Sequence, residues 1–465
     1  MSNFLFNEFK EVSAKQWKQK IQADLKGSDY NDTLIWKNLE GIDVKPFYHH
    51  DNFPNGFQNI TGHPSKWNIL QSFFIDDEAI TNQLILDAIN RGAEAVYLHS
   101  EKEFIIENVF ADFPFSTCPI YFDFHFLSEE FILKLNQFLS NNKATAFYNI
   151  DIIGNLAKTG NWFYNLKTDH TIVEKFLNNN TSENLLSIDT TLYQNAGATM
   201  VQQLAYGMAH ANEYLNHFSN SFQKQKKNVQ EATPIFTFKI AIGTNYFFEM
   251  AKIRAFRKLY ALIAKEYGVS ENCHLITFST KRNKTLYDYN VNLLRTSTEN
   301  MSAIQGGADS ICSTAYDAIY HKSNEFGERI ARNQLLITKQ ESYFDFPEDP
   351  VKGAYYIESL TEQISEKALQ LFKNIEANGG FLSQLKEGTI QRKIKESAKK
   401  EQDLFDEGKL ELLGTNIHPN SNDRMKDELE IFPFVKTKIR KTLLEPIIEK
   451  RLSESLEQKR LKNEE

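Results

Sequence analysis

The segment PIFTFKIAIGTNYFFEMAKIRAFRKLYALIAKEYGVSENCHLITFST (residues 234–280) decides the fold. Two short runs rich in Phe, Ile and Thr, 234–242 and 273–280, flank a stretch whose apolar residues recur at i, i+3, i+4 and i+7. The runs have the length and composition of buried strands, and the stretch between them has the period of an amphipathic helix. The segment therefore predicts a strand–helix–strand unit of an α/β protein.

The same alternation continues on both sides of this segment. Helix-like spans separate six further strand-like runs, which are 67–75, 95–100, 119–126, 144–153, 184–190 and 308–314. Eight strands alternating with helices predict a (β/α)8 TIM barrel over residues 61–345. A doubly wound open sheet stays the alternative, because a count of strands does not close a barrel.

Helical additions are expected at both ends of the barrel. Residues 1–60 are predicted as a helical arm and loop, since Trp17, Ile21 and Leu25 recur at four-residue spacing before Gly27. Strand signals stop after about residue 350, and residues 346–465 are predicted as a helical region whose charged last segment is a surface helix.

Composition excludes several classes of protein. The 465 residues include 36 Phe, and 41% are hydrophobic, which is enough for a large core and rules out a disordered chain. The formal net charge of −8 argues against a nucleic-acid binder. Three widely spaced cysteines fit neither a disulfide scaffold nor a zinc ribbon. With no signal-peptide pattern and no apolar run of membrane-spanning length, a cytoplasmic protein is expected.

Functional groups of a parallel barrel lie at the C-terminal ends of its strands. No GxGxxG, GxxxxGK[ST], HExxH or GxSxG motif occurs there. The polar candidates that this rule selects are Ser72, His99, Asp123, His125, Asp151, Asp189, Gln194, Thr244, Asn245, Ser279, Lys281, Arg282, Ser310 and Cys312.

Two groups of candidates can be interpreted either as metal ligands or as ordinary structural residues. Asp123-Phe-His125 matches the start of D-x-H-x-x-G, by which some corrin enzymes ligate cobalt, but the sixth position is Ser128. Two such residues on one face of a strand can also simply bond each other, and this interpretation is favoured. His210, Glu213 and His217 share a helix face that could hold a metal, although an ordinary polar face is again favoured.

The segment from Ser279 to Lys284 is polar and basic and directly follows a predicted strand. Lys281, Arg282 and Lys284 are therefore candidates for an anion site of the kind that binds a phosphate group. A solvated loop is an equally good interpretation. Gly306 and Gly307 open the next strand, where the backbone is expected to approach a neighbour closely.

Several long motifs resemble the methylmalonyl-CoA mutase family. They are RNKTLYDYNVNLLRTSTENMSA, GGADSICSTAYDAIYHKSNEFGERIARNQLLI, KQESYFDFPEDPVKGAYYIESLT, YQNAGATMVQQLAYGMAHANEYL, FFEMAKIRAFRKLYALIAKEYG and EGIDVKPFY. The similarity extends to the closing segment EPIIEKRLSESLEQKRLK, so it covers nearly the whole chain. The resemblance implies a barrel and favours it over the open sheet.

The resemblance also implies that the working positions of the family's active barrel are replaced here. Ser72 falls where the active chain has a Tyr, and Leu192 falls where it has a His. Asp309 takes the place of a substrate-contacting Gln, and Gly307 that of a nearby His. Leu cannot transfer a proton, and Ser is too short to replace a phenol. No catalytic residue and no metal site are therefore expected in this chain.

The family's catalytic chain adds a flavodoxin-like domain that binds adenosylcobalamin, and this sequence ends where that domain would begin. The resemblance is thus to the small (β) subunit of the heterodimeric bacterial enzyme. It implies a structural partner of a catalytic large (α) subunit, which binds the cofactor and the CoA esters and interconverts (R)-methylmalonyl-CoA and succinyl-CoA. Bulky groups on both faces of several strands predict a filled barrel axis. The alternative is the catalytic barrel of a split mutase that uses a separate cobalamin-binding chain.

Overall fold

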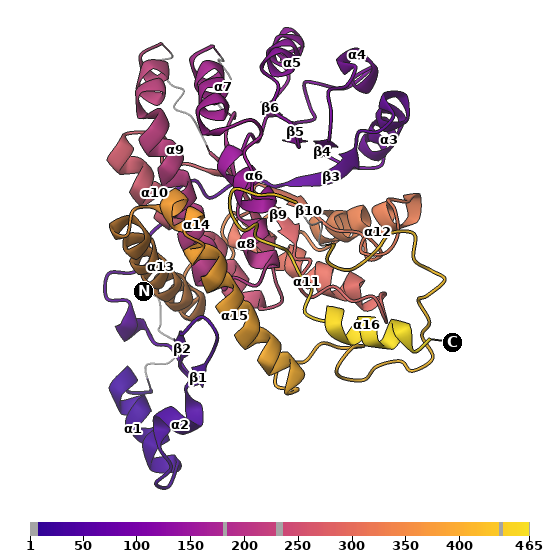
Figure 1. The fold of residues 1–465 in the computed structure, drawn as a ribbon. Coiled ribbons are helices and arrows are strands. Elements are labelled where there is room, and N and C mark those ends of the chain that lie inside the picture. Colours follow the sequence, from indigo (N-terminus) through magenta and orange to yellow (C-terminus); the bar gives the residue numbers. More distant parts are fainter. Residues whose placement is uncertain (1–7, 180–183, 229–235, 437–439, 465) are drawn as a thin grey trace.

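The computed structural model describes residues 8–179, 184–228, 236–436 and 440–464. Eight parallel strands form its central sheet, with helices packed around them (Figure 1). The strands are β3 (Asn68–Phe74), β4 (Ala95–Ser100), β5 (Ile120–Phe124), β6 (Ala146–Phe147), β7 (Ser187–Asp189), β8 (Thr237–Ile242), β9 (His274–Ser279) and β10 (Ser310–Cys312). Each lies within one of the eight predicted runs.

The sheet curls strongly, as in a TIM barrel. Its strand order is β6-β5-β4-β3-β10-β9-β8-β7, so the first strand of the unit, β3, pairs with the last, β10. The outer strands β6 and β7 meet just beyond their assigned ends, where Ile150 forms a parallel bridge with Leu186. Ile150 N–H donates to Leu185 O at 3.0 Å, and Ser187 N–H donates to Ile150 O at 3.1 Å. The predicted barrel is confirmed, and the open sheet is set aside.

Helices follow the strands and cover the outside of the sheet. They are α3 (Glu78–Asn90), α4 (Ile106–Val109), α5 (Glu129–Asn141), α6 (Ile152–Thr159), α7 (Leu166–Asn179), α8 (Thr191–Asn195), α9 (Met200–Asn228), α10 (Tyr246–Tyr267), α11 (Val291–Gly306) and α12 (Glu325–Leu336) with the π-helical turn η2 (Ile337–Glu341). None of the described helices is long and apolar enough to cross a membrane.

Side chains fill the axis of the barrel. A separate apolar cluster there contains Leu70, Ala95, Tyr97, Tyr121, Phe147, Ile276 and Cys312, all buried. The rings of Tyr121 and Phe147 stack with centroids 4.3 Å apart. The Tyr121 hydroxyl lies 2.9 Å from both His274 Nε2 and Ser310 Oγ, so its polar end is satisfied inside the core. The predicted filled axis is confirmed at this level of the barrel.

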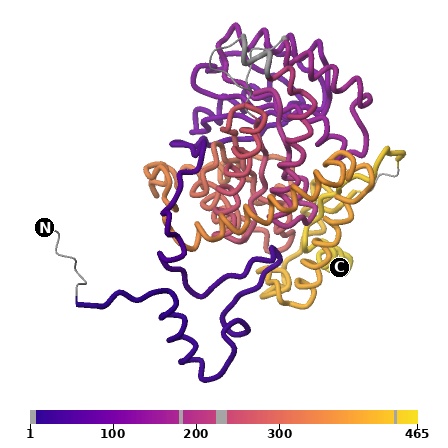
Figure 2. Tube along the Cα trace, turned by 90° about the vertical axis from the view of Figure 1, so that its left-hand side faces the viewer, coloured from indigo at the N-terminus to yellow at the C-terminus, as the bar shows by residue number. Residues whose placement is uncertain are grey.

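The N-terminal arm extends from the body (Figure 2). It carries α1 (Ala14–Asp24), α2 (Tyr30–Leu34), the short pair β1 (Trp36–Lys37) and β2 (Asp43–Val44), and the 3-10 turn η1 (His50–Asn52). Ser13 caps α1 in a capping box with Gln16, yet α1 buries no residue at all. Trp17 of its apolar stripe packs edge-on against Phe47 at 6.1 Å, but no residue of the helix is fully buried within the described chain.

The C-terminal region is only partly helical. Helix α13 (Tyr355–Ala377) packs on α9 and α10, and α14 (Phe381–Lys386) packs on α9. Helix α15 (Thr389–Asp406) follows α14, and α16 (Glu454–Lys462) comes last (Figure 1). Between α15 and α16, the described residues form turns and extended backbone. The surface helix predicted for the last segment is therefore confined to α16, because Pro446 interrupts the apolar stripe before it.

Candidate functional site at the mouth of the barrel

Five polar side chains from four strands form a group that we call the mouth cluster: His99, Asp123, His125, Asp189 and Lys239. The first four lie at or just past the C-terminal ends of β4, β5 and β7, and Lys239 joins them from the middle of β8. Parallel pairing brings them together, since β4 and β5 align His99 with Asp123, and β7 and β8 align Asp189 with Lys239. This end of a TIM barrel is where its functional groups lie. The four predicted candidates His99, Asp123, His125 and Asp189 are thus brought into one site.

Lys239 connects the two sides of the cluster. Its side chain is 5% exposed, and Nζ donates to Asp123 Oδ1 at 2.9 Å and to Tyr97 Oη at 3.0 Å. Asp189 Oδ2 lies 3.3 Å from the same Nζ. Burial lowers the pKa of Lys239, but attraction by Asp123 and Asp189 outweighs it and raises that pKa well above its usual range. The ammonium is therefore charged and fixed in place.

Asp123 is the centre of the cluster. While Oδ1 accepts from Lys239, Oδ2 lies 2.7 Å from His99 Nδ1 and 3.5 Å from His125 Nε2. Burial raises the pKa of Asp123, but Lys239 and the two imidazoles overcome it and hold that pKa well below its usual value. The other imidazole nitrogen of His125, Nδ1, lies 2.7 Å from Glu101 Oε1. Asp123 therefore presents an ionised carboxylate to two imidazoles.

Three residues of this site are not among the candidates predicted from the sequence: Lys239, Tyr97 and Glu101. Lys239 offered a signal, because it is a single charge inside the otherwise apolar run TFKIAI of β8. A lysine buried in a barrel strand needs a carboxylate partner, and the mouth is where one is available. Glu101 carried no such signal, because it stands among other charged residues after β4.

The second predicted cluster does not converge on one point. His210 is fully buried, with Nδ1 3.0 Å from Tyr193 Oη and Nε2 3.0 Å from Asp151 Oδ1. Glu213 instead accepts from the backbone N–H of Leu382 at 2.8 Å. The ring of His217 packs on His170, 4.4 Å between centroids. The favoured interpretation of these residues as structural groups agrees with this geometry.

The basic segment after β9 is held by ion pairs. Lys281 Nζ lies 3.1 Å from Glu449 Oε2, and Arg282 pairs with Glu401 at 2.8 Å. Lys284 is 3% exposed and lies 2.9 Å from Glu299 Oε2. Lys281, at 61% exposed, presents the most open cation of the three. The anion site stays a prediction, and an incoming phosphate would compete with these carboxylates.

The C-terminal segment crosses this part of the mouth. Lys450 N–H donates to Asn195 O at 3.0 Å, and Leu452 N–H donates to Arg282 O at 2.8 Å. Arg282 in turn donates to Lys450 O at 2.6 Å. The segment around residues 449–452 thus bonds to α8, which follows β7, and to the loop that follows β9.

The four positions at which the resemblance predicts replaced family residues lie in different parts of the barrel. Ser72 sits in β3 beside Tyr97, and Leu192 follows β7 in α8 with 4% of its surface exposed. Asp309, just before β10, accepts from Arg257 at 2.6 Å, and the carbonyl of Gly307 accepts from the same guanidinium. Gly307 and Asp309 therefore belong to the N-terminal end of the strands, away from the mouth.

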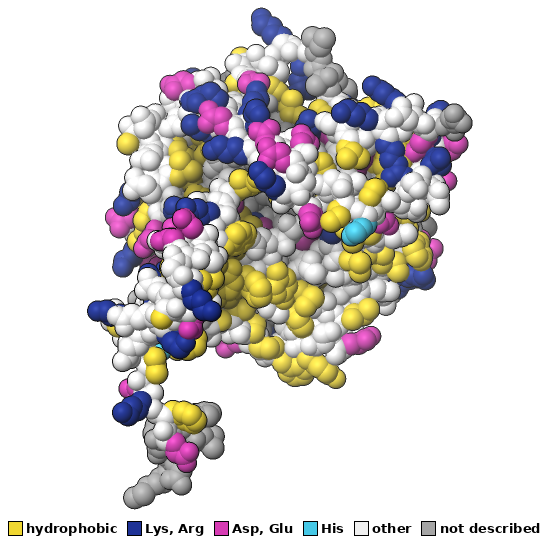
Figure 3. Space-filling view, turned by 90° about the horizontal axis from the view of Figure 1, so that it is seen from below, with side chains coloured by type: hydrophobic (Ala, Val, Ile, Leu, Met, Phe, Trp, Pro, Cys, Tyr) yellow, Lys and Arg dark blue, Asp and Glu magenta, His cyan; other side chains and the backbone are white. Residues whose placement is uncertain are grey.

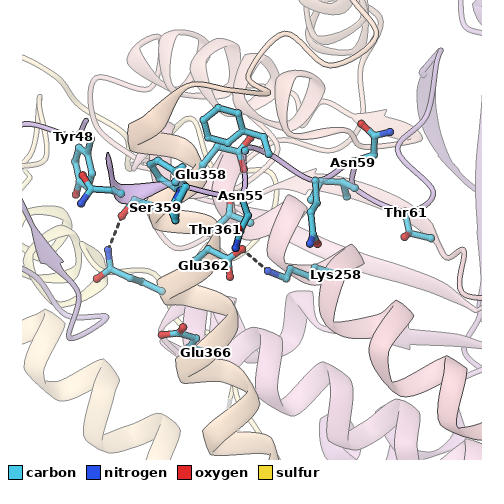
Figure 4. Close-up of a pocket in the computed structure, with 18 of the residues that line it drawn as sticks. Tyr48, Asn55, Asn59, Thr61, Lys258, Glu358, Ser359, Thr361, Glu362 and Glu366 are labelled. Atoms are coloured by element: carbon cyan, nitrogen blue, oxygen red, sulfur yellow. Dashed lines mark hydrogen bonds and ion pairs between the residues drawn. The ribbon is translucent and has the colours of Figure 1, made fainter. Parts of the chain in front are cut away.

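A separate cavity of about 780 Å³ lies outside the barrel, between the loop at residues 52–61 and helices α10 and α13 (Figure 4). Glu358, Glu362 and Glu366 line its α13 side. Lys258 Nζ lies 2.5 Å from Glu362 Oε1 and is thereby neutralised. An acidic lining of this kind repels phosphates, so this cavity is a poor place for a CoA ester.

The curled parallel sheet with its polar mouth places the chain among TIM-barrel α/β proteins. A family model described as methylmalonyl-CoA mutase matches residues 126–463. The methylmalonyl-CoA mutase small subunit of Porphyromonas gingivalis is 31% identical over 460 residues, which cover 92% of this chain and 73% of that subunit. Methylmalonyl-CoA mutase of Rhizobium meliloti is 27% identical over 478 residues, which cover 90% of this chain and 66% of that enzyme.

The chain belongs to the methylmalonyl-CoA mutase family and is a homologue of its small subunit. The predicted resemblance is confirmed. Among solved structures, a Plasmodium falciparum HPPK-DHPS structure matches with a TM-score of 0.32 and 12% identity, covering 77% of this chain and 59% of that one.

The methylmalonyl-CoA mutase family depends on cobalamin, so the D-x-H pair must be tested as a cobalt ligand. In that motif the Asp orients the nitrogen of the His that faces away from the metal. Here Glu101 holds the far nitrogen of His125, and Asp123 is on the side of Nε2, where cobalt would bind. The described residues also form no second sheet of flavodoxin type. The residues present therefore do not fit cobalamin.

Proposed function

We propose that this chain is the non-catalytic small subunit of a methylmalonyl-CoA mutase and stabilises a catalytic large subunit. The large subunit would bind adenosylcobalamin and interconvert (R)-methylmalonyl-CoA and succinyl-CoA. The filled axis carries the proposal: Tyr97, Tyr121 and Phe147 occupy the space that an extended acyl-CoA would need within the barrel. An axis packed to core density leaves no room for such a ligand.

The arm supports a role in assembly. An isolated helix as short as the 11 residues of α1 is marginal in water and needs a surface to pack on. Large apolar side chains of the arm stay exposed, including Phe9 at 74%, Trp17 at 50% and Trp36 at 52%. Apolar side chains also gather across the face of the body in Figure 3. Such aromatic surface is typical of the core of a protein–protein interface.

The test is to produce this chain and the large subunit of the same organism, separately and together. We expect the two to copurify and the pair to be active with adenosylcobalamin. The isolated small chain should neither bind adenosylcobalamin nor turn over substrate. Turnover by this chain with a separate cobalamin-binding chain would overturn the proposal in favour of a split mutase.

A substitution experiment tests separately whether this chain is non-catalytic. The double variant Ser72→Tyr, Leu192→His restores the residue types that the family's active barrel has at these positions. We expect it to remain inactive when supplied with a cobalamin-binding chain, because the packed axis would still exclude an acyl-CoA. Measurable turnover would contradict this, and circular dichroism would verify that the variant is folded.

A further inference from the structure

We propose that His99, Asp123 and His125 bind a divalent transition-metal ion of the zinc type at the mouth of the barrel. One ligand atom from each of the three residues lies within 4.8 Å of the others. The printed contacts favour His99 Nδ1, Asp123 Oδ2 and His125 Nε2 as these atoms. Two imidazoles and one carboxylate are a ligand set that zinc and iron(II) accept in proteins. This inference concerns the chain itself and does not depend on the proposed role in a mutase.

The distances suit such an ion with little movement. Two ligands each about 2.1 Å from zinc, at a tetrahedral angle, lie about 3.4 Å apart. His125 Nε2 is 3.5 Å from Asp123 Oδ2, and His99 Nδ1 is 2.7 Å from it. Binding therefore requires that the His99 imidazole withdraw from Asp123 by about 0.7 Å and that the two imidazoles, whose ligand atoms lie within 4.8 Å, face the same ion.

The surroundings of the three side chains support the assignment. A metal-bound His commonly donates its other N–H to a carboxylate, which fixes the ring and its tautomer. Glu101 Oε1 stands 2.7 Å from His125 Nδ1, in the place of such a partner. Tyr97 packs edge-on against the His99 ring at 4.8 Å, which fixes the second imidazole. The site is thus oriented before an ion arrives.

Charge and access also favour a cation. Lys239 occupies only Oδ1 of Asp123 and leaves Oδ2 to the imidazoles. With neutral imidazoles, the directly contacting carboxylates of Glu101, Asp123 and Asp189 outnumber the one ammonium of Lys239, three to one. A divalent ion would offset this excess of directly contacting carboxylates, to which Lys158 and Lys281 add positive charge only at longer range. His99 and His125 are 32% and 34% exposed, so the ion can enter and retain water as a further ligand.

The test uses the full chain without a histidine tag. After removal of metals with a chelator, zinc titration by calorimetry should show one equivalent bound per chain. His99→Gln and His125→Gln should each weaken zinc binding by about a hundredfold or more, and Glu101→Gln by about tenfold. His321→Gln is the matched control, because His321 is comparably exposed and faces a single carboxylate, Asp317 at 3.2 Å. It should bind zinc as the native chain does.

Cobalt(II) provides a second measurement on the native chain alone, should a variant fail to fold. Bound in place of zinc, it should give visible absorption bands of a four- or five-coordinate nitrogen and oxygen site. A native chain that binds no zinc and shows only the spectrum of hydrated cobalt(II) would overturn the proposal. Unchanged zinc affinity in both His99→Gln and His125→Gln would overturn it too. The cluster would then be a network of imidazoles and carboxylates only.

Discussion

Gly307 meets two demands that no other residue type can meet. It ends α11 with φ +93°, and a Cβ there would lie 2.5 Å from His63 Nε2. We expect Gly307→Ala to lower the free energy of unfolding by about 2–4 kcal/mol, from left-handed backbone strain and overpacking together.

Gly388→Ala is the matched control for this prediction. Gly388 also has positive φ, +75°, but a Cβ there would meet nothing within 4 Å. It should cost only the backbone strain, about 1 kcal/mol. Chemical denaturation of both variants measures the difference, and equal losses would show that His63 yields without cost.

Glu328 makes stability depend on pH. Burial raises the pKa of its carboxyl from 4.5 to about 7. Between these values the folded chain holds a proton that the unfolded chain has released, so the free energy of unfolding should fall as pH rises from 4.5 to 7. Glu328→Gln should remove about 1 kcal/mol of this fall, less than the full shift implies because the side chain is only half-buried.

Denaturation with urea at pH 5, 6, 7 and 8 tests this prediction. Glu325→Gln, on the same helix with its side chain 75% exposed, is the control and should leave the pH dependence as it is. A native-like pH dependence in Glu328→Gln would assign the effect to other groups.

At the scale of elements, the buried strands could be predicted and their ends could not. All six residues of β8 are buried, and its run of apolar residues shows this in the sequence. The predicted strand at 144–153 shrinks to β6, because Asn149 adopts φ +51° and Asp151 caps α6. Apolar composition continues through that turn, so only backbone conformation separates strand from helix there.

The buried ion pair of β8 should matter far more than a surface pair. Lys239→Met would leave Asp123 and Asp189 without the ammonium between them, and we expect a loss of about 3–5 kcal/mol in unfolding free energy. Lys258→Met, which breaks the exposed pair with Glu362, should cost less than about 1 kcal/mol. Thermal or chemical denaturation compares them, and similar losses would contradict the prediction.

At the scale of the whole molecule, only some residues of the mouth cluster could be predicted from the sequence. His99, Asp123, His125 and Asp189 could be predicted as candidates, since each ends a strand. Lys239, which pairs with Asp123 and Asp189, was not predicted, although a single charge inside the apolar run of β8 was a signal for it. The crossing of the mouth by residues 449–452 was also unpredictable, since it depends on single backbone contacts with loops far away in the chain.

We expect the arm to contribute to binding of the large subunit but not to the free energy of unfolding of the chain. Trp17→Glu should leave the unfolding free energy of the isolated chain within about 0.5 kcal/mol, because Trp17 is half exposed. The affinity of the Trp17→Glu variant for the large subunit should fall at least tenfold, as expected when an aromatic anchor is lost from an interface. Leu133→Glu on α5, 37% exposed and far from the arm in Figure 1, is the control. Equal affinity losses for both variants in a binding titration would contradict a specific role of the arm.

The segment that crosses the mouth has a consequence during translation. All eight barrel strands leave the ribosome well before residues 449–452, which bond to Asn195 and Arg282. The nascent barrel therefore emerges with its mouth uncovered and Arg282 lacking its backbone acceptor. Domains generally fold as units while the chain is still being made. The strands of the barrel are therefore available for folding before the segment that crosses its mouth.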